Sequence, residues 1–245
     1  MRRAEEGVCD EVVPTAHGTA LLTPSLPLVW QVNAIRVEDA AAGVKELAAE
    51  ADEVQRGFGH RKLMMHDEQL GARLAPQFAA AGWNVFRVLI MVRRRVPDRE
   101  PRPGAAAEVS RRVGAATLAA FRREQPFGWQ DEAVRQLAEM DERYTRVLAA
   151  RDFASPPADP ACACRLYTHD GLGQVDEVGT LEARRRRGHA RAAVAAAADA
   201  AAAAGCEQVF MVTDAADWPQ ELYRRLGFDE IGATYEFLKL PMSSR

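Results

Sequence analysis

The chain has 245 residues, 48% hydrophobic and 27% charged, a composition typical of a globular protein rather than a disordered or fibrous one. Its net charge of -3 offers no strong field for nucleic acid or an anionic membrane. No apolar run reaches the roughly 18 residues of a spanning helix, and the first residues lack the apolar stretch of a secretory signal. These features predict a cytoplasmic protein without nucleic-acid or membrane partners.

The cysteines and histidines do not form a recognisable metal or disulfide pattern. Cys162 and Cys164 are two residues apart, which suits neither a Cys-x-x-Cys motif nor a disulfide framework. The histidines have no zinc-ligand spacing among themselves or with cysteine. The sequence therefore predicts reduced thiols and no metal site.

The first third of the chain predicts a strand–helix–strand unit behind a loose arm at residues 1–20. Asp67 is a plausible N-cap and Gly82 a plausible C-cap of the central helix. The expected elements are, in chain order, a strand at 29–37, a helix from 38 or 39 to about 55, a strand at 61–65, a helix at 67–81 and a buried strand at 84–92.

A charged, proline-rich stretch ending at Gly104 is the best candidate linker. We therefore expect an N-terminal half at 1–95, a linker at 96–104 and a second domain at 105–245. Beyond the linker the pattern predicts helices at 106–123 and 131–148 with a break at 125–128, a loop at 155–160, a hairpin of strands 161–168 and 174–180 with a five-residue connection, a helix at 188–204, a strand at 208–213, a helix at 218–226 that begins with Pro219, and a strand at 234–240.

The arginine-rich loop before the helix at 188–204 carries the strongest chemical signal. Backbone N–H groups at a helix start have no intrahelical acceptor, and with the macrodipole they form an anion site. Gly188 lacks a Cβ, so a phosphate can approach its backbone closely, and four arginines at 184–187 add positive charge. The run is short and the chain is net acidic, which favours a phosphate cradle over a nucleic-acid patch. No Gly-Lys-Ser/Thr follows, so this is not a Walker loop.

Two motifs at a consistent distance carry a family resemblance. Arg185-x-x-Gly188-x-Ala190 resembles the pyrophosphate loop of the GCN5-related N-acetyltransferases, the GNAT superfamily. Leu222-Tyr223-Arg224-Arg225-Leu226-Gly227-Phe228 resembles that family's Leu-Tyr-x-x-Leu-Gly-Phe signature. The resemblance covers roughly 105–240 and is best from Gln174 onward. It implies an α/β fold with a mixed central sheet and flanking helices, the acyl-CoA N-acyltransferase (GNAT) fold, and a tandem arrangement of two such units is expected.

The resemblance also implies how acetyl-CoA is held as the acyl donor. The strands Gln174–Thr180 and Gln208–Thr213 would splay apart to admit it. Backbone groups of Val178, Gly179 and Thr180 would pair with the pantetheine amides as an added strand would. The pyrophosphate would be held by the amides of Arg185, Arg186, Arg187, Gly188, His189, Ala190 and Arg191. His189 itself reads as a solvent-facing side chain, and Arg186 departs from the family by standing where a glycine is frequent. Gly179 marks either a β-bulge or a weak point in the strand.

Tyr223 is the candidate general acid, because a protonated phenol can supply the proton that a departing thiolate needs. Asp176 or Glu177 is the candidate base for the incoming amine, directly or through water. Successive strand residues point to opposite faces, which leaves one of the two facing the cleft, and the sequence does not say which.

The N-terminal half echoes the strand–helix–strand order of the C-terminal one, which suggests a degenerate GNAT-like unit. Its helix entry, Met65-His66-Asp67-Glu68, has no glycine and two carboxylates that would repel pyrophosphate, so no cofactor site is expected there. The function expected is direct acetyl transfer to the amine of a small molecule or peptide in a ternary complex, by a monomer or homodimer. The alternative is a non-catalytic acyl-CoA-binding sensor or regulatory protein.

Overall fold

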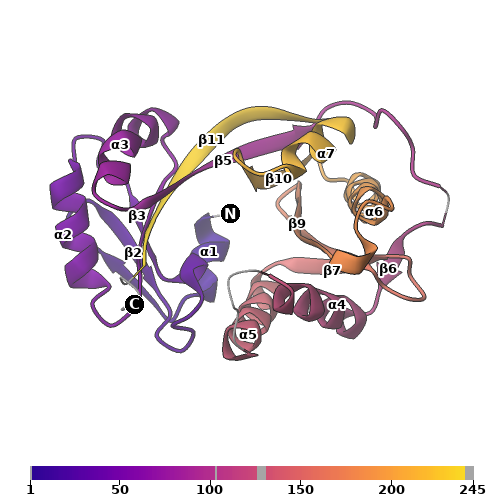
Figure 1. Cartoon of the computed structure of the whole chain (residues 1–245), viewed down its shortest axis with the longest axis horizontal. Coiled ribbons are helices and arrows are strands. Elements are labelled where there is room, and N and C mark those ends of the chain that lie inside the picture. The colour runs from indigo at the N-terminus through magenta and orange to yellow at the C-terminus, as the bar shows by residue number, and fades with distance from the viewer. Residues whose placement is uncertain (1, 103, 126–130, 241–245) are drawn as a thin grey trace. The chain divides into compact units, whose positions relative to one another are not determined.

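The computed structural model describes residues 2–102, 104–125 and 131–240 and shows a mixed α/β chain (Figure 1). It divides into two compact units. The N-terminal unit comprises Met1–Leu89, Asp214–Ala216 and Gly232–Arg245, and the C-terminal unit comprises Ile90–Thr213 and Asp217–Ile231. These units divide the chain at other points than the predicted ranges 1–95, 96–104 and 105–245. The division into a half without a cofactor site and a cofactor-binding domain stays a prediction.

The N-terminal unit has the strand order β1-β2-β3-β4-β11-β5, with β2 antiparallel to β1 and β3, and β3 parallel to β4. Its elements are α1 (Arg2–Val8), β1 (Glu11–Pro14), β2 (Gly18–Leu22), a 3-10 turn (Trp30–Val32), β3 (Ala34–Val37), α2 (Val44–Val54), β4 (Arg61–Met65), α3 (Glu68–Ala80), β5 (Asn84–Arg93) and the second part of β11 (Phe228–Lys239).

Residues 1–20 are not a loose arm, as the sequence suggested, but hold a helix and two paired strands. These elements escape a periodicity test because each is short, and all four residues of β1 are exposed at the sheet edge. The helix expected from 38 or 39 begins only at Val44, because Gly43 is its N-cap. By contrast, Asp67 caps α3 as predicted: its Oδ1 accepts the N–H groups of Gln69 and Leu70 at 2.8 and 3.0 Å.

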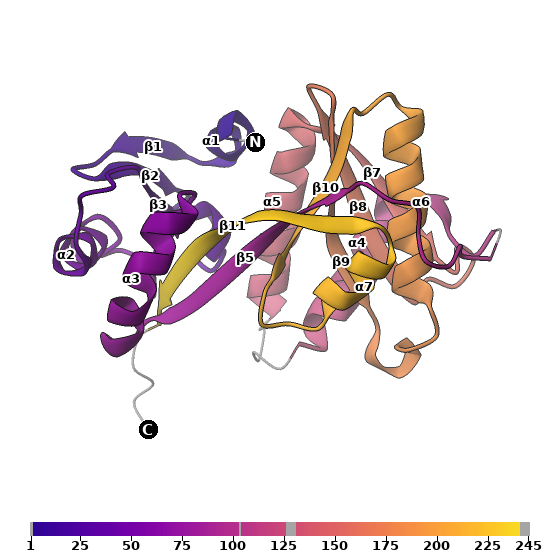
Figure 2. The same ribbon diagram turned by 90° about the horizontal axis from the view of Figure 1, so that it is seen from above.

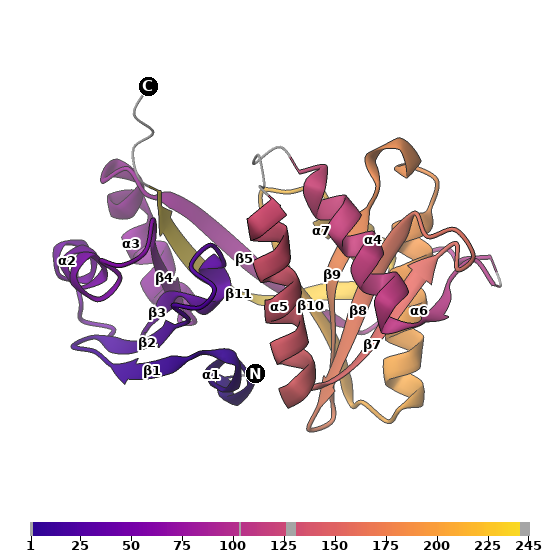
Figure 3. The ribbon, with the colours of Figure 1, turned by 90° about the horizontal axis from the view of Figure 1, so that it is seen from below.

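The core of the N-terminal unit lies between the sheet and the two helices α2 and α3 (Figure 3). Leu47 from α2 and Leu74 and Phe78 from α3 pack on the side chains of β3, β4 and β11. The ring of Phe78 lies 4.4 Å from that of Phe237 and 5.1 Å from that of Trp83, centroid to centroid. This aromatic group anchors α3 on the last strand.

The C-terminal unit has the strand order β5-β10-β9-β8-β7-β6, and Ile90–Arg93 of β5 belong to it. Helix α6 covers one face of β7, β8 and β9, while α4 and α5 cover the other (Figures 2 and 3). Its elements are β6 (Ala107–Val109), α4 (Arg111–Arg123), α5 (Asp131–Val147), β7 (Ala149–Ser155), β8 (Cys162–His169), β9 (Leu172–Thr180), a 3-10 turn (Glu182–Arg184), α6 (His189–Ala203), β10 (Gln208–Asp214) and α7 (Pro219–Arg225), followed by the start of β11.

Two strands of this unit were not predicted, and one turn is tighter than expected. Strand β6 falls at the start of the helix predicted at 106–123, and β7 fills the stretch between the helix predicted to end at 148 and the loop predicted at 155–160. The β8–β9 connection is Asp170–Gly171 rather than five residues, and both residues have positive φ, 47° and 75°. Two such residues in a two-residue loop match the right-handed twist of the hairpin, which is why Asp-Gly is favoured there.

Helices α5, α6 and α7 lie close to their predicted positions, whereas α4 begins at Arg111 instead of 106 because β6 takes up residues 107–109. Helix α6 ends one residue before 204 with Gly205 in the left-handed region, and α7 begins with Pro219 in its first turn. The break expected at 125–128 lies, apart from Gln125, outside the described residues. None of the helices in the described ranges combines the length and apolar character needed to cross a membrane.

Candidate functional site

The parallel strands β9 and β10 are paired only where they begin. Their register runs from Gln208 opposite Leu172 to Phe210 opposite Gln174, and within the described residues no further pair follows. Residues 175–180 of β9 therefore continue without β10 as a partner on that edge. This is the splayed pair that the sequence led us to expect, and it leaves backbone groups of β9 available to a ligand.

A β-bulge interrupts β9 at its centre. Ala163 of β8 lies opposite Gly179 and Arg165 lies opposite Asp176, so one residue of β8 faces the two residues Glu177 and Val178. Glu177 has a φ of 54°, a left-handed conformation that a side chain with a Cβ rarely adopts. The bulge therefore lies just before Gly179, not at it, and it redirects the side chains of β9.

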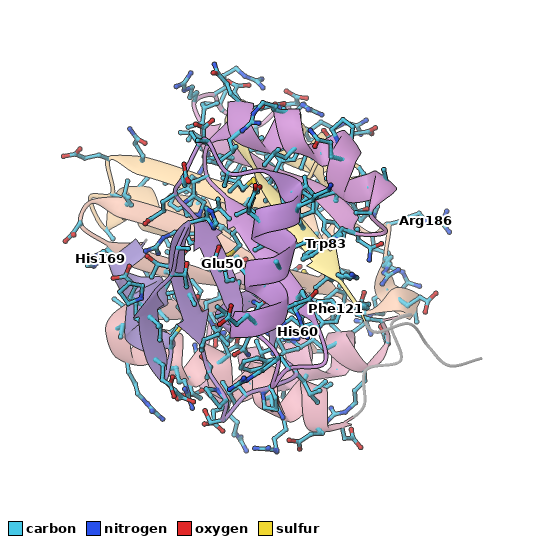
Figure 4. The ribbon with its side chains drawn as sticks, turned by 90° about the vertical axis from the view of Figure 1, so that its left-hand side faces the viewer. Glu50, His60, Trp83, Phe121, His169 and Arg186 are labelled. Carbon is cyan, nitrogen blue, oxygen red and sulfur yellow. The ribbon has the colours of Figure 1, made fainter. Side chains whose placement is uncertain are left out.

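Gly179 has a packing role instead. A Cβ built on it would lie 2.5 Å from Cδ1 of Phe121 and 2.6 Å from Cγ, so the ring of Phe121 from α4 rests directly on this backbone. The absence of a side chain at Gly179 therefore sets how closely α4 approaches the bulged strand. Phe121 is labelled in Figure 4.

This close packing predicts that Gly179→Ala is destabilising. Overpacking by one methyl group in a closely packed contact typically costs about 1–3 kcal/mol. The free energy of unfolding, measured by urea titration, is expected to fall by that amount. Gly57→Ala is the matched control, because a Cβ at Gly57 meets no atom within 4 Å. Equal free energies of unfolding for the two variants would show that the Phe121 ring moves aside without destabilising the protein.

The loop between β9 and α6 contains two residues in the left-handed region. Gly188, the N-cap of α6, has a φ of 85°, and a Cβ built there would meet no atom within 4 Å. Arg186 has a φ of 62°, which explains why glycine suits this position. The side chain of Arg186 is exposed and projects away from the protein (Figure 4). The departure from the family pattern thus keeps the glycine-like backbone and adds an exposed positive charge.

The backbone N–H groups of residues 186–191 donate to no carbonyl in the described part of the chain, and the first bond of α6 runs from Ala192 N to Gly188 O at 3.1 Å. The side chains of the neighbouring arginines have different environments. Arg185 donates from Nε to Thr180 O at 3.3 Å, Arg184 pairs with Asp159 at 3.1 Å, and Arg187 is exposed. Together these groups form a cradle of free amides and positive charge at the carboxyl end of β9.

His189 was expected to face solvent, and the structure instead holds it in place. Its Nδ1 lies 3.1 Å from Oγ of Ser155, and that hydroxyl donates its proton to Ala105 O at 2.7 Å. The hydroxyl therefore accepts from His189, which makes Nδ1 the protonated nitrogen. Burial lowers the pKa of His189, and Arg184 and Arg187 lower it further, so the ring carries no charge at neutral pH. Its backbone amide remains part of the cradle.

Tyr223 lies on α7, beyond the carboxyl end of β10. Its side chain is 6% exposed, and its hydroxyl forms no hydrogen bond with any other residue that the structure describes. Burial raises the pKa of the phenol above its ordinary value, and the neighbouring groups Cys164 and Asp176 raise it further. Tyr223 is therefore a protonated and unengaged donor over the whole neutral range, next to the bulged part of β9.

The two candidate bases differ in how their oxygens are used. Asp176 accepts from Gln174 Nε2 at 3.0 Å with one oxygen and from the N–H of Glu177 at 2.8 Å with the other. Glu177 binds Arg122 through Oε2, and Oε1 has no partner within the described residues. Burial raises the pKa of Glu177 to about 7; Asp141 and Asp176 add to this rise and Arg122 opposes it. Burial also raises the pKa of Asp176.

The bulge changes the expectation that only one carboxylate can face a given side. Glu177 binds Arg122 directly, so its carboxylate lies on the side of β9 that α4 covers. The bulge inserts one residue into the ladder, so strict alternation no longer assigns a face to Asp176. The hydrogen bonds distinguish the two carboxylates instead: both oxygens of Asp176 accept hydrogen bonds, whereas Oε1 of Glu177 has no partner among the described residues.

Sequence reasoning missed the buried ionic residues behind these carboxylates. They are Arg122, Asp141, Asp152 and Arg165. A signal was present: Arg165 interrupts the apolar strand Cys162–Tyr167, and Asp141 shares the buried face of α5 with Leu137. Charged residues at core positions of predicted elements mark a paired network. Among residues 2–102, 104–125 and 131–240, no three His, Cys, Asp or Glu side chains are grouped to hold a metal ion.

The predicted strand–helix–strand unit of the N-terminal half, β4–α3–β5, is arranged differently. Strand β11 lies between β4 and β5 in the sheet, so the two strands are not neighbours. At the start of α3, the carboxylate of Asp67 accepts the N–H groups of Gln69 and Leu70 at 2.8 and 3.0 Å. The Asp67 carboxylate thus occupies the position at which α6 presents free amides.

Residues 115–228 match the family model described as "Acetyltransferase (GNAT) family". No curated protein matches the chain. Among solved structures, the chain is similar to a functionally unknown conserved protein from Staphylococcus epidermidis, at 16% identity and a TM-score of 0.68, over 96% of this chain and 95% of that one. It is also similar to a GCN5-related N-acetyltransferase from Kribbella flavida, at 20% identity and a TM-score of 0.60, over 98% and 95%.

A third similar structure is a GCN5-related N-acetyltransferase from Sphaerobacter thermophilus, at 17% identity and a TM-score of 0.51, over 74% of this chain and 60% of that one. At such identities these likenesses speak to the fold alone. They confirm the predicted fold, a mixed α/β architecture with a central mixed sheet and flanking helices as in GNAT-fold proteins.

Proposed function

We propose that this chain is an N-acetyltransferase that transfers the acetyl group of acetyl-CoA directly to an amine, because residues 115–228 match the GNAT acetyltransferase family model. The observation that carries the proposal is the meeting of four features at one end of the parallel pair β9–β10. They are the open strand edge, the cradle of free amides, the protonated Tyr223 and the carboxylate of Glu177. Ligands of α/β sheets commonly bind at the carboxyl ends of the strands. The cytoplasm is the compartment we propose for this reaction.

The cradle fits the diphosphate of coenzyme A in charge and in space. The N–H groups of residues 186–191 point to the helix start, and Gly188 leaves its Cβ position empty. A dianion there would be stabilised by the amides, the helix dipole and Arg187. The unpaired edge of Val178–Thr180 would receive the pantetheine amides. Acetyl-CoA supplies an acyl group activated as a thioester.

Glu177 is the better candidate for the base. Its Oε1 is free among the described residues, whereas both oxygens of Asp176 are occupied. A carboxylate with a pKa of about 7 is well matched to accept a proton near neutral pH. Glu177 would take one proton from the ammonium form of the acceptor, and the neutral amine would then attack the thioester carbonyl.

Tyr223 would complete the proton balance. The departing sulfur leaves with the electron pair of the C–S bond, and the phenol donates its proton to that sulfur, giving the free thiol of coenzyme A. After the C–N bond forms, the nitrogen loses its second proton, which passes through water to the tyrosinate and restores the phenol. The proton held by Glu177 is then released to solvent. Asp176 supports this role, because its negative charge beside the phenol helps to keep Tyr223 protonated.

The experiment that tests this function is a thiol-release assay with acetyl-CoA across a panel of small amines, amino acids and peptide N-termini. Calorimetric titration with acetyl-CoA alone serves as the binding control. We expect tight binding and turnover on at least one class of amine. Tight binding without turnover on any amine would instead support the non-catalytic sensor. If acetyl-CoA does not bind, both the acetyltransferase hypothesis and the sensor hypothesis are wrong.

The cradle is tested by Gly188→Val. The β-branched side chain would occupy the space that we assign to the pyrophosphate, so acetyl-CoA affinity is expected to fall at least tenfold, a loss of about 1.4 kcal/mol. The valine would also be strained at a φ of 85°, so stability needs its own control.

Gly205→Val is that control. Gly205 ends the same helix with a φ of 83°, and a Cβ there also meets no atom within 4 Å. It should therefore suffer the same backbone strain but leave acetyl-CoA binding unchanged. Parental affinity in Gly188→Val, or an equal loss in both variants, would place the pyrophosphate elsewhere.

A further inference from the structure

Arg122 lies between two carboxylates that come from different elements. Its side chain is 7% exposed on α4. Nη1 lies 3.1 Å from Oδ2 of Asp141, and Nη2 donates to Oδ1 of the same carboxylate at 3.2 Å. The same Nη2 also donates to Oε2 of Glu177. One guanidinium therefore joins α5 to the bulged residue of β9.

Asp141 is itself fixed from behind. Its Oδ2 also lies 3.1 Å from Nη1 of Arg165, whose side chain is completely buried on β8. Nε of Arg165 donates to Oδ1 of Asp152 on β7 at 2.7 Å. The result is a row of alternating charges, Asp152–Arg165–Asp141–Arg122–Glu177, that ends at the proposed base.

The cluster carries more negative than positive charge. The charged and titratable groups around Glu177 are Arg122 on α4, Asp141 on α5 and Asp176 on β9, with Arg165 and Tyr167 on β8 and Asp152 on β7 behind them. Arg111 on α4 also reaches the row, with Nη1 3.7 Å from Oδ1 of Asp152. Three guanidiniums thus face four carboxylates, and this excess of negative charge favours the protonated form of Glu177.

We propose that Arg122 and Asp141 form a positioning pair for catalysis: Arg122 holds the Glu177 carboxylate in the left-handed bulge, and Asp141 balances the charge of Arg122 so that this carboxylate stays basic enough to accept a proton. The proposal rests on the assignment of Glu177 as the base. Neither partner touches the reacting atoms.

The two partners are expected to act on Glu177 in opposite directions. Loss of the Arg122 charge disfavours ionised Glu177 and raises its pKa, whereas loss of the Asp141 charge leaves the guanidinium unbalanced and lowers that pKa. A residue that served only to hold the fold together would not produce two opposite shifts.

The test is the acid limb of the pH–rate profile of acetyl transfer, measured for the full chain. We expect Arg122→Gln to move its midpoint to higher pH and Asp141→Asn to move it to lower pH, each by about one unit or more. The double variant should return toward the parental midpoint, and Arg122→Lys, which keeps the charge, should do the same. Shifts in one direction only, or no shift, would overturn the proposal.

Arg123→Gln is the matched control. It removes the same charge one residue along α4, from a side chain that is 55% exposed and pairs with Asp131. Its acid limb should stay at the parental midpoint, and an equal shift would show that any positive charge on α4 suffices. Each single variant retains two of the four ionic contacts of the row, and circular dichroism verifies folding. If Arg122→Gln does not fold, Asp141→Asn is expected to shift the acid limb to lower pH while Arg122→Lys keeps the parental midpoint, and an unmoved limb in Asp141→Asn would overturn the proposal.

A second readout separates this proposal from the proposed function. The carboxyl carbon of Glu177 can be titrated by NMR in the protein labelled with ¹³C-glutamate, with Glu177→Gln identifying its signal. If Arg122→Gln and Asp141→Asn shift this titration in opposite directions but the protein acetylates no amine, the effect of the pair on Glu177 is supported and the proposed enzymatic function is rejected. If the protein acetylates an amine but neither variant shifts the titration of Glu177, the enzymatic function stands and the positioning role of Arg122 and Asp141 is rejected.

Discussion

Replacing Glu177 with Gln is expected to lower kcat by about 10²–10⁴-fold, the usual contribution of a general base. The amide keeps the size of the side chain and can still accept a hydrogen bond from Arg122. It cannot take a proton from the acceptor ammonium. Because the proposed acetyl-CoA cradle lies at residues 186–191, the affinity for acetyl-CoA should change little.

The pH dependence identifies the group. Glu177 must be ionised to act, and burial raises its pKa to about 7, so the parental kcat should fall as the pH drops below 7. This limb should disappear in Glu177→Gln, which leaves a low, flat profile. Acceptors of low amine pKa, which are already deprotonated, should lose the least activity.

Asp176→Asn is the comparison that decides between the two carboxylates. Asp176 raises the pKa of Glu177, so its neutralisation should move the acid limb to lower pH without abolishing it. If Asp176→Asn removes the limb and Glu177→Gln retains it, the base is Asp176 and the assignment made here is wrong.

Local signals explain why the cradle could be predicted from the sequence. Gly188 is required by a φ of 85° at the start of α6, and the arginines before it are contiguous in the chain. Pro219 in the first turn of α7 likewise marks where the helix that carries Tyr223 begins. Each of these features depends on only a few consecutive residues, so it can be recognised in one sequence without knowledge of the long-range contacts.

The bulge could not be predicted in the same way. It exists because β9 is held against β8 in two registers, with Ala163 opposite Gly179 and Arg165 opposite Asp176. The change of register depends on the pairing of β8 with β9, so the sequence of β9 alone does not reveal it. A strict period of two therefore assigns Asp176 and Glu177 to opposite faces, and the left-handed Glu177 in the bulge removes the basis for that assignment.

The ionic row was missed for a related reason. The contacts of Arg122 reach 19 residues ahead to Asp141 and 55 residues ahead to Glu177. Helical and strand periodicity reports which residues are buried but not which buried charges meet. Only the packing of α4, α5 and β9 around one guanidinium shows that the proposed base has a fixed partner.

Sheet pairing over long distances also limits the domain prediction. The strand β5 is contiguous with the first half in sequence, yet Ile90–Arg93 belong to the C-terminal unit, next to β10. A chain that begins after residue 103 would lack this strand. Boundaries drawn at a proline-rich stretch therefore separate segments of sequence that need not fold apart.

Tyr223→Phe is expected to lower kcat by about 10²–10⁴-fold with acetyl-CoA affinity little changed, because a general acid acts mainly in the transition state. The substitution removes one oxygen and keeps the ring. Since the hydroxyl bonds to no other described residue, no partner in the described chain is left unsatisfied, and the free energy of unfolding should stay close to parental.

The raised pKa of Tyr223 sharpens this prediction. A phenol with its ordinary pKa would lose its proton near pH 10, whereas burial beside Cys164 and Asp176 holds the proton to higher pH. The parental kcat should therefore show no basic limb from Tyr223 below pH 10, and the loss in Tyr223→Phe should be uniform from pH 7 to 10. Tyr235→Phe, on β11 in the N-terminal unit, controls for the loss of a tyrosine hydroxyl as such. A Tyr223→Phe enzyme with parental kcat, measured where chemistry limits the rate, would leave protonation of the thiolate to water and reduce Tyr223 to a packing residue.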